Sequence, residues 1–161
     1  MHNYLYALLL LAAPGLSAAS DSPIDVPMTD RGASTFYVSV QAIGTAREPF
    51  LIDTGSSYTA INESLLAQLV DARQVEYLKD LEGTLADGST QIVPLYNIKS
   101  LMVGERCLLS DVRAAVFPGK TRNILGLSAL RPAAPFGFSF DPPRLTLSHC
   151  QTPQAGIAGS R

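Results

Sequence analysis

One stretch of the sequence combines residue types that can carry out acid–base chemistry. It runs from Pro49 to Ser57 and reads Pro-Phe-Leu-Ile-Asp-Thr-Gly-Ser-Ser. The apolar residues 50–52 predict a buried strand, and the small residues after Asp53 predict a turn, because glycine accepts unusual backbone angles and hydroxyl groups can bond to the freed amides. Asp53 is therefore expected at the point where a strand ends. A carboxylate held in this way can remove a proton from water.

The segment Asp53-Thr54-Gly55-Ser56 resembles the active-site loop of aspartic proteases, and the length and layout of the chain are similar to the retropepsin-like group. Two further segments follow in the order of that family. Ala86-Asp87-Gly88 stands where the family has its flap, and Asn123-Ile124-Leu125-Gly126 is similar to the apolar-apolar-Gly signature behind the catalytic loop. The resemblance covers the chain from about Phe36 to Cys150.

This resemblance implies an aspartic-type endopeptidase of the exported bacterial type, which works without a metal or another cofactor. Two adjacent carboxylates that share one proton supply both the base and the acid that peptide hydrolysis requires. The loop occurs once in the sequence, so the resemblance implies a homodimer in which Asp53 of each subunit meets the other across a two-fold axis. It also implies that Thr54 bonds across this axis and that the Gly55 amide approaches the carboxylates.

The remaining roles implied by the resemblance have alternatives. Ser56 would place its hydroxyl against the outer carboxylate oxygen of Asp53, or it would only stabilise its own turn. Ala86-Asp87-Gly88 would contact an extended peptide substrate, although Asp87-Gly88 also suits the tight turn of any hairpin. Ile124-Leu125-Gly126 would be structural, with Gly126 allowing a close backbone approach.

A second function remains open, namely a non-enzymatic peptide-binding module with the same fold and dimer. A serine hydrolase is disfavoured for two reasons. Apart from His2, which lies in the expected signal peptide, His149 is the only histidine that could serve as a base, and Gly126-Leu127-Ser128-Ala129 lacks the second glycine of a nucleophile elbow. No metal site is predicted either, because Cys107, His149 and Cys150 lack the spacing of metal ligands.

The segments around the loop predict an all-β fold. Residues 36–42 alternate between apolar and polar side chains, which indicates a half-buried strand, and Gly44-Thr45 turns the chain back toward residues 50–52. Strands at such spacing are typical of a sandwich or a barrel. The other strands are expected at residues 58–61, 83–86, 89–93, 96–103, 107–109, 112–117, 136–140 and 145–150.

Two short helical segments complete this prediction. Asn62 is a suitable N-cap for a helix that carries Leu65, Leu66 and Leu69, and residues 127–130 predict a helical turn. The resemblance makes the expected fold class specific: a single-domain retropepsin-like acid-protease β-barrel with one or two short helices, active as a two-fold homodimer.

The 161 residues suffice for one domain with its own core. We expect a signal peptide at residues 1–19, because a short apolar run there is followed by small residues. Residues 20–35 are expected as a lead-in that is mobile or forms an edge segment, residues 36–150 as the protease domain and residues 151–161 as a flexible tail. The apolar run falls short of the roughly 18 residues of a spanning helix, so no stable membrane insertion is expected.

The net charge and the cysteines limit which partners and which cellular compartment are expected. The formal net charge is -2 and the basic residues are scattered, so no nucleic-acid partner is predicted. An exported chain would be periplasmic or secreted. An oxidising compartment favours a disulfide between Cys107 and Cys150 over two buried free thiols.

Overall fold

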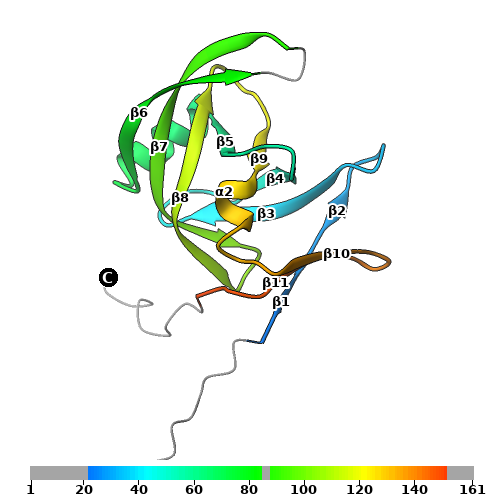
Figure 1. Cartoon of the computed structure of the whole chain (residues 1–161). Coiled ribbons are helices and arrows are strands. Elements are labelled where there is room, and N and C mark those ends of the chain that lie inside the picture. Colours follow the sequence, from blue (N-terminus) through cyan, green and yellow to red (C-terminus); the bar gives the residue numbers. More distant parts are fainter. Residues whose placement is uncertain (1–21, 85–87, 152–161) are drawn as a thin grey trace, which may run out of the picture.

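The computed structural model describes residues 22–84 and 88–151, and these residues form two β-sheets with two short helices (Figure 1). The all-β class predicted from the sequence is confirmed. In chain order the elements are β1 (Ile24–Pro27), β2 (Thr29–Asp30), β3 (Phe36–Ala42), β4 (Glu48–Ile52), β5 (Thr59–Asn62), α1 (Glu63–Asp71), β6 (Val75–Thr84), β7 (Thr90–Val103), β8 (Cys107–Phe117), β9 (Asn123–Leu125), α2 (Leu127–Leu130), β10 (Phe136–Phe140) and β11 (Pro143–Leu147).

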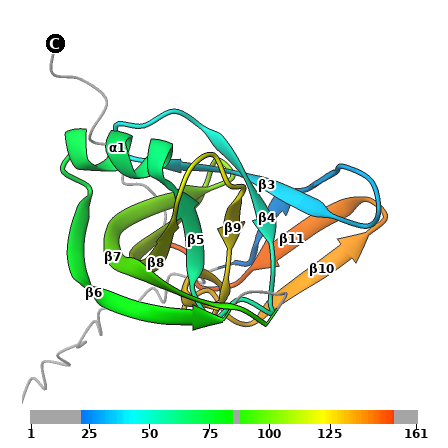
Figure 2. The same cartoon turned by 90° about the horizontal axis from the view of Figure 1, so that it is seen from above.

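The larger sheet curls around the hydrophobic core. Its eight strands have the order β2-β3-β4-β9-β5-β8-β7-β6, and an additional pairing of β3 with β7 brings two distant strands of the sheet together. Figure 2 shows β6, β7 and β8 on one side and β3, β4 and β9 on the other. Large side chains from both sides meet between them, and these include Phe50, Ile61, Ile98, Leu101 and Leu125, none more than 1% exposed. The alternation in the sequence therefore marks the inner face of a closed, barrel-like sheet.

The hairpin that delivers Asp53 lies where the sequence predicts it. Strand β3 pairs antiparallel with β4 and places Val38 opposite Phe50, both of which are buried. After β5 the helix α1 begins at the predicted N-cap, because the Asn62 side chain accepts a hydrogen bond of 2.8 Å from the Leu65 amide. Asp53 is thus fixed between two elements with well-defined ends.

The segment before β3 belongs to the folded unit. Strand β1 pairs with β11 in a three-stranded sheet of order β1-β11-β10, and β2 pairs with β3. Ile24, Val26 and Met28 are buried in the main core. Of the two alternatives for residues 20–35, the described part forms edge strands, and the folded unit therefore extends to the N-terminal side of Phe36.

Some predictions concern residues that the structure does not describe. The expected signal at residues 1–19 and the tail after Gln151 lie outside the described ranges. Within those ranges, no helix has the length and apolar character needed to cross a bilayer.

Strand β6 is much longer than the sequence indicates. Eight of its ten residues were not expected in a strand, because most of its side chains are exposed and the apolar-polar alternation is absent. Pairing with β7 holds it, with an irregularity in register between Tyr77 and Lys79. Together β6 and β7 form the long hairpin at the top of Figure 1.

Strand β8 also differs from the prediction. It is continuous through Ser110 and Asp111, where the sequence predicted a break, and Asp111 has a φ of 55°.

A disulfide between Cys107 and Cys150 connects the two sheets, as predicted. Cys107 begins β8 of the larger sheet, and Cys150 follows β11 of the smaller one. Both cysteines are buried, and an isolated bridge between Leu108 and Gln151 extends the contact. The smaller sheet is therefore covalently fixed to the barrel.

We predict that replacing Cys107 and Cys150 together by Ala lowers the free energy of unfolding by about 4 kcal/mol, because the bond closes a loop with a sequence separation of 43. Urea unfolding monitored by circular dichroism measures this. Reductant serves as the matched control: it should destabilise the wild type by a similar amount and leave the double variant unchanged. An unfolding midpoint that is the same in all four samples would contradict the prediction.

Candidate active site

Asp53 is held in a tight loop directly after β4. Its amide donates to the Leu125 carbonyl at 3.2 Å, and its Oδ1 accepts a hydrogen bond of 2.8 Å from the Gly55 amide. The Ser56 amide donates to the Asp53 carbonyl at 3.3 Å, which closes the turn. The side chain is half-buried, and its Oδ2 has no hydrogen-bond partner among the described residues. One carboxylate oxygen is therefore fixed and the other is available to water or to another group.

The residues after Asp53 shape the loop in different ways. Gly55 lies close to the carboxylate, since a Cβ at this position would be 3.1 Å from Asp53 Oδ1. Thr54 is exposed on the loop. The Ser56 hydroxyl donates to the Tyr58 carbonyl at 2.7 Å, which corresponds to the alternative in which Ser56 stabilises its own turn. A hydroxyl has one proton, so in this arrangement Ser56 does not donate to Asp53.

The segment Ile124-Leu125-Gly126 lies directly behind the Asp53 loop. Strand β9 pairs in parallel with β4 and places Ile52 beside Leu125. Gly126 then meets the loop backbone, where a Cβ would lie 2.2 Å from the Tyr58 carbonyl oxygen and 2.9 Å from that of Ser56. No side chain larger than hydrogen fits at this contact.

Residues of helix α2 form hydrogen bonds with the C-terminal end of the Asp53 loop. The Leu127 amide donates to the Ser56 carbonyl at 2.8 Å, and Ser128 Oγ accepts a hydrogen bond of 2.7 Å from the Thr59 amide. The same hydroxyl donates to the Arg113 carbonyl on β8 at 2.6 Å. Sequence reasoning considered Ser128 only as a nucleophile, whereas the structure shows it joining α2, β5 and β8.

Asn123 supports the loop from the other end of β9. Its buried side chain accepts a hydrogen bond from the Asn62 amide at 3.0 Å and donates to Glu48 Oε2 at 2.6 Å. Gln68 of α1 donates to the other oxygen of Glu48 at 3.3 Å. This network connects β4, β9 and α1, so it fixes the strand that carries Asp53.

Two hollows adjoin the loop on different sides. One of about 340 Å³ lies between the loop and the β6–β7 hairpin, with Tyr58, Leu81, Val93 and Phe117 among its lining residues. A more open hollow of about 810 Å³ includes Asp53 itself and lies toward the β10–β11 hairpin. Aromatic and aliphatic side chains supply most of its wall, and these include Phe36, Leu51, Ile52, Phe138 and Phe140.

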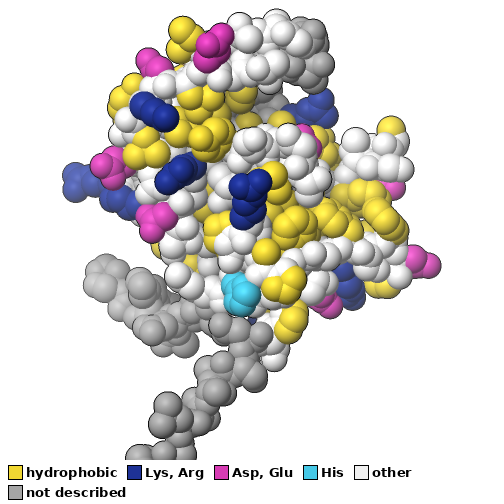
Figure 3. Space-filling model, in the orientation of Figure 1, with side chains coloured by type: hydrophobic (Ala, Val, Ile, Leu, Met, Phe, Trp, Pro, Cys, Tyr) yellow, Lys and Arg dark blue, Asp and Glu magenta, His cyan; other side chains and the backbone are white. Residues whose placement is uncertain are grey.

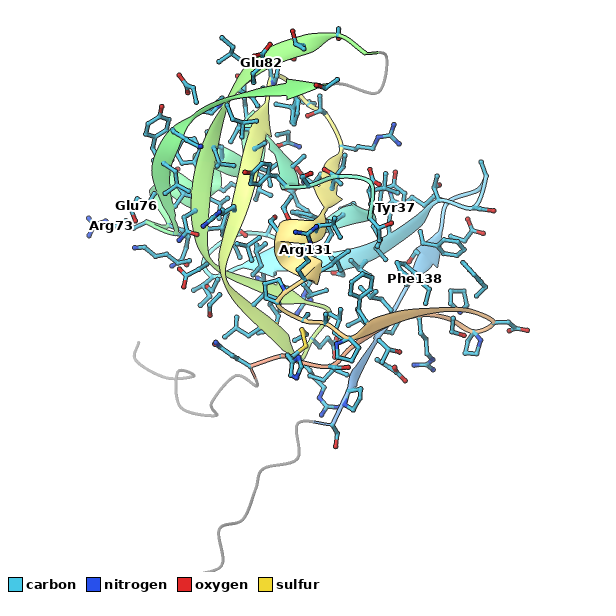
Figure 4. All side chains as sticks on the ribbon, in the orientation of Figure 1. Tyr37, Arg73, Glu76, Glu82, Arg131 and Phe138 are labelled. Carbon is cyan, nitrogen blue, oxygen red and sulfur yellow. A yellow bond between two sulfur atoms is a disulfide. The ribbon has the colours of Figure 1, made fainter. Side chains whose placement is uncertain are left out.

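Figure 4 places labelled residues on these two sides: Glu82 lies on the β6–β7 hairpin, whereas Tyr37 and Phe138 lie on the β3 and β10 side. Of the predicted flap residues, Ala86 and Asp87 lie outside the described ranges. Gly88 is exposed and has a φ of 83°, a value that favours glycine.

Comparisons with known proteins agree with this geometry. The family model described as "gag-polyprotein putative aspartyl protease" matches residues 38–132, which is more than half of the chain and includes Asp53 and Gly126. The crystal structure of a retropepsin-like aspartic protease from Rickettsia conorii is 20% identical, with a TM-score of 0.55. This match covers 78% of the chain described here and 91% of the other, and shows a shared fold. No curated protein sequence matches the chain.

We predict that Gly126→Ala destabilises the protein by about 1–3 kcal/mol or more, because the new methyl group overlaps the Tyr58 carbonyl. The backbone angles of Gly126 suit any residue, so the cost is steric. Urea unfolding measures the change.

Gly137→Ala is the matched control, since a Cβ there meets nothing within 4 Å and the expected change is within about 0.5 kcal/mol. Equal stability of the two variants would show that the contact behind the loop is not as tight as described.

Proposed function

Because this chain belongs to the aspartyl protease family of gag polyproteins and has a retropepsin-like fold, we propose that it is an endopeptidase whose catalytic groups are Asp53 and the Asp53 of a second copy. The position of Asp53 carries this proposal. Its Oδ1 is bound to the Gly55 amide, while Oδ2 has no partner among the described residues, at a loop that adjoins two hollows. Such a carboxylate is oriented and still accessible.

The proposed reaction needs one ionised and one protonated carboxylate. The ionised Asp53 removes a proton from a water molecule, whose oxygen attacks the carbonyl carbon of the peptide, while the protonated carboxyl donates its proton to the carbonyl oxygen. Collapse of the tetrahedral gem-diol then breaks the C–N bond: the proton taken from water passes to the leaving nitrogen, and one hydroxyl returns a proton to the carboxylate that had donated its own, so the pair again holds one proton. One carboxylate cannot hold both states at once, and the chain offers one Asp-Thr-Gly loop, so a second copy supplies the other.

The hollow beneath the β6–β7 hairpin is proposed to bind the substrate. Leu81, Val93 and Phe117 provide apolar surface, and the loop residues Ser56 and Tyr58 form its floor. An extended peptide suits this place, because β6, which lines the hollow, ends the larger sheet and pairs within the described residues with β7 alone, so one of its edges is open to another strand. We therefore propose an extended peptide with an apolar side chain next to the cleaved bond as the substrate.

A location outside the cytoplasm is part of this proposal. The Cys107–Cys150 disulfide is compatible with an exported protein, since such bonds persist in oxidising compartments. We propose a periplasmic or secreted protease whose residues 1–19 act as the export signal.

We predict that Asp53→Asn reduces cleavage of an unfolded protein substrate by about 10²–10⁴-fold, because the base is lost. Asn keeps an Oδ1 that can accept the Gly55 amide hydrogen bond, so the loop should be retained. Asp25→Asn is the control: it also removes one negative charge and keeps an Oδ1 acceptor, here for Thr146, on β1.

Cleavage that survives in Asp53→Asn would exclude the protease assignment. Peptide binding retained without cleavage in the wild type would instead favour the alternative, a binding module with this fold.

We also predict that an excess of the Asp53→Asn protein lowers the activity per wild-type chain, because mixed dimers contain one catalytic aspartate. Substrate is kept in large excess so that the variant does not deplete it. The control is an equal excess of wild-type protein, which should not lower the activity per chain. If the variant has no effect although it exchanges subunits with the wild type, one aspartate suffices and the paired mechanism is wrong.

A further inference from the structure

A third hollow lies at the point where the Asp53 loop leads into β5. Its volume is about 430 Å³, and its walls come from the end of the loop, from β8 and from α2 with the residues that follow it. Two of its lining residues are Arg113, on β8, and Arg131, at the C-terminal end of α2. We call it the arginine hollow. The proposed reaction does not use it.

The two arginine side chains of this hollow are available to a ligand. Both residues are exposed, and neither side chain forms a hydrogen bond or an ion pair within the part of the chain that the structure describes. The acidic lining residue, Asp111, instead accepts a hydrogen bond of 3.0 Å from the Asn97 side chain. The hollow is therefore positive, although the chain as a whole has a formal net charge of -2. Figure 3 shows Lys and Arg side chains on this face, over α2 and the strands beside it.

Hydrogen bonds hold the backbone on both sides of the arginine hollow. The Ser128 hydroxyl donates to the Arg113 carbonyl at 2.6 Å and accepts from the Thr59 amide at 2.7 Å, which joins α2 to β8 and β5. The Arg131 amide donates to the Leu127 carbonyl at 3.0 Å. The two arginines thus extend from fixed positions, which lowers the entropic cost of binding a ligand between them.

The arginine hollow is continuous with the hollow proposed to bind the substrate. Ser57 and Tyr58 line both of them. Ser57 is exposed and forms no hydrogen bond among the described residues, so its backbone groups are open to a peptide. A peptide that lies extended beneath the β6–β7 hairpin can therefore pass Ser57 and reach Arg113 and Arg131.

The two connected hollows differ in charge. Glu82 lines the substrate hollow, and neither Lys nor Arg is among its described lining residues. Figure 4 shows this separation, with Glu82 on the β6–β7 hairpin and Arg131 on α2. An acidic side chain is therefore favoured beside the arginines and not next to the cleaved bond.

We propose that the arginine hollow is a specificity subsite that binds an acidic side chain of the substrate, away from the cleaved bond. This inference rests on the proposed function, which places an extended peptide in the neighbouring hollow. A guanidinium group offers N–H donors in one plane and can bind both oxygens of a carboxylate. Two such groups favour Asp or Glu and repel Lys or Arg. The substrate class thus becomes an extended peptide with an apolar residue beside the cleaved bond and an acidic residue farther along the chain.

The test compares peptides that are blocked at both ends, so that no terminal carboxylate competes. A single Glu is moved along the peptide one position at a time, and Gln replaces it in the matched peptide. At one outer position the wild type should cleave the Glu peptide with a kcat/KM about three- to tenfold higher, because each exposed ion pair contributes a factor of up to about five. This preference should decrease at high salt.

Substitution of both arginines tests whether they cause the preference. Arg113→Gln/Arg131→Gln should lower the Glu-to-Gln ratio to about one, and the ratio cancels any general loss of activity. Arg106→Gln/Arg122→Gln is the matched control, because these two arginines are also exposed but line neither hollow. It should keep the preference for Glu. Arg113→Glu/Arg131→Glu should prefer Lys over Gln at the same position, a reversal that a purely structural defect would not produce.

Binding of the same peptides to the Asp53→Asn protein, measured by fluorescence anisotropy, tests the subsite without cleavage. Glu-dependent binding in a protein whose wild type cleaves nothing would exclude the endopeptidase and support the subsite, so the two failures are distinguishable. The proposal would be overturned by cleavage and binding that do not depend on Glu at any position. A preference that survives in Arg113→Gln/Arg131→Gln, or that is lost equally in the control, would also overturn it.

Discussion

The contact between Gly126 and the carbonyl groups of Ser56 and Tyr58 is the constraint on which the rest of the structure depends. It leaves no room for a Cβ, so the Asp53 loop and the start of α2 must lie backbone against backbone. Around this contact, the Asp53 amide bonds to Leu125 and the Leu127 amide bonds to Ser56. The loop is thereby fixed at both ends by main-chain groups, which leaves the Asp53 side chain free to act rather than to stabilise the fold.

Sequence patterns predict the elements whose two faces differ. Strand β3 and the helix that follows Asn62 lie where the pattern indicates, because one face of each element packs on the core and the other faces solvent. Strand β6 was missed since its side chains are mostly exposed on both faces and only its ladder to β7 holds it. The edge strands before Phe36 were left open for a related reason. Strand β1 pairs with β11, which is distant in sequence, and β2 consists of two exposed residues and carries no alternation.

The same distinction applies to the candidate active site. Asp53 and Gly126 could be recognised because local chemistry or steric need restricts the residue type at each position. The roles of Ser56 and Ser128 depend on which carbonyl lies within reach, and this is decided by tertiary packing. The disulfide could be predicted from two cysteines and an oxidising compartment, but its task of fixing the small sheet, and with it β10, to the barrel is visible only in three dimensions. The sequence thus predicts where the candidate carboxylate lies in the fold better than it predicts what surrounds that carboxylate.

The central claim is that two copies of Asp53 act together. It is tested most directly by a crystal structure of the chain with a statine-type inhibitor, whose hydroxyl mimics the tetrahedral intermediate. The expected result is a two-fold dimer in which carboxylate oxygens of both Asp53 side chains lie within hydrogen-bond distance of that hydroxyl and of each other. An inhibitor bound to a single chain, or a dimer whose two Asp53 side chains are too far apart to share a proton, would contradict it.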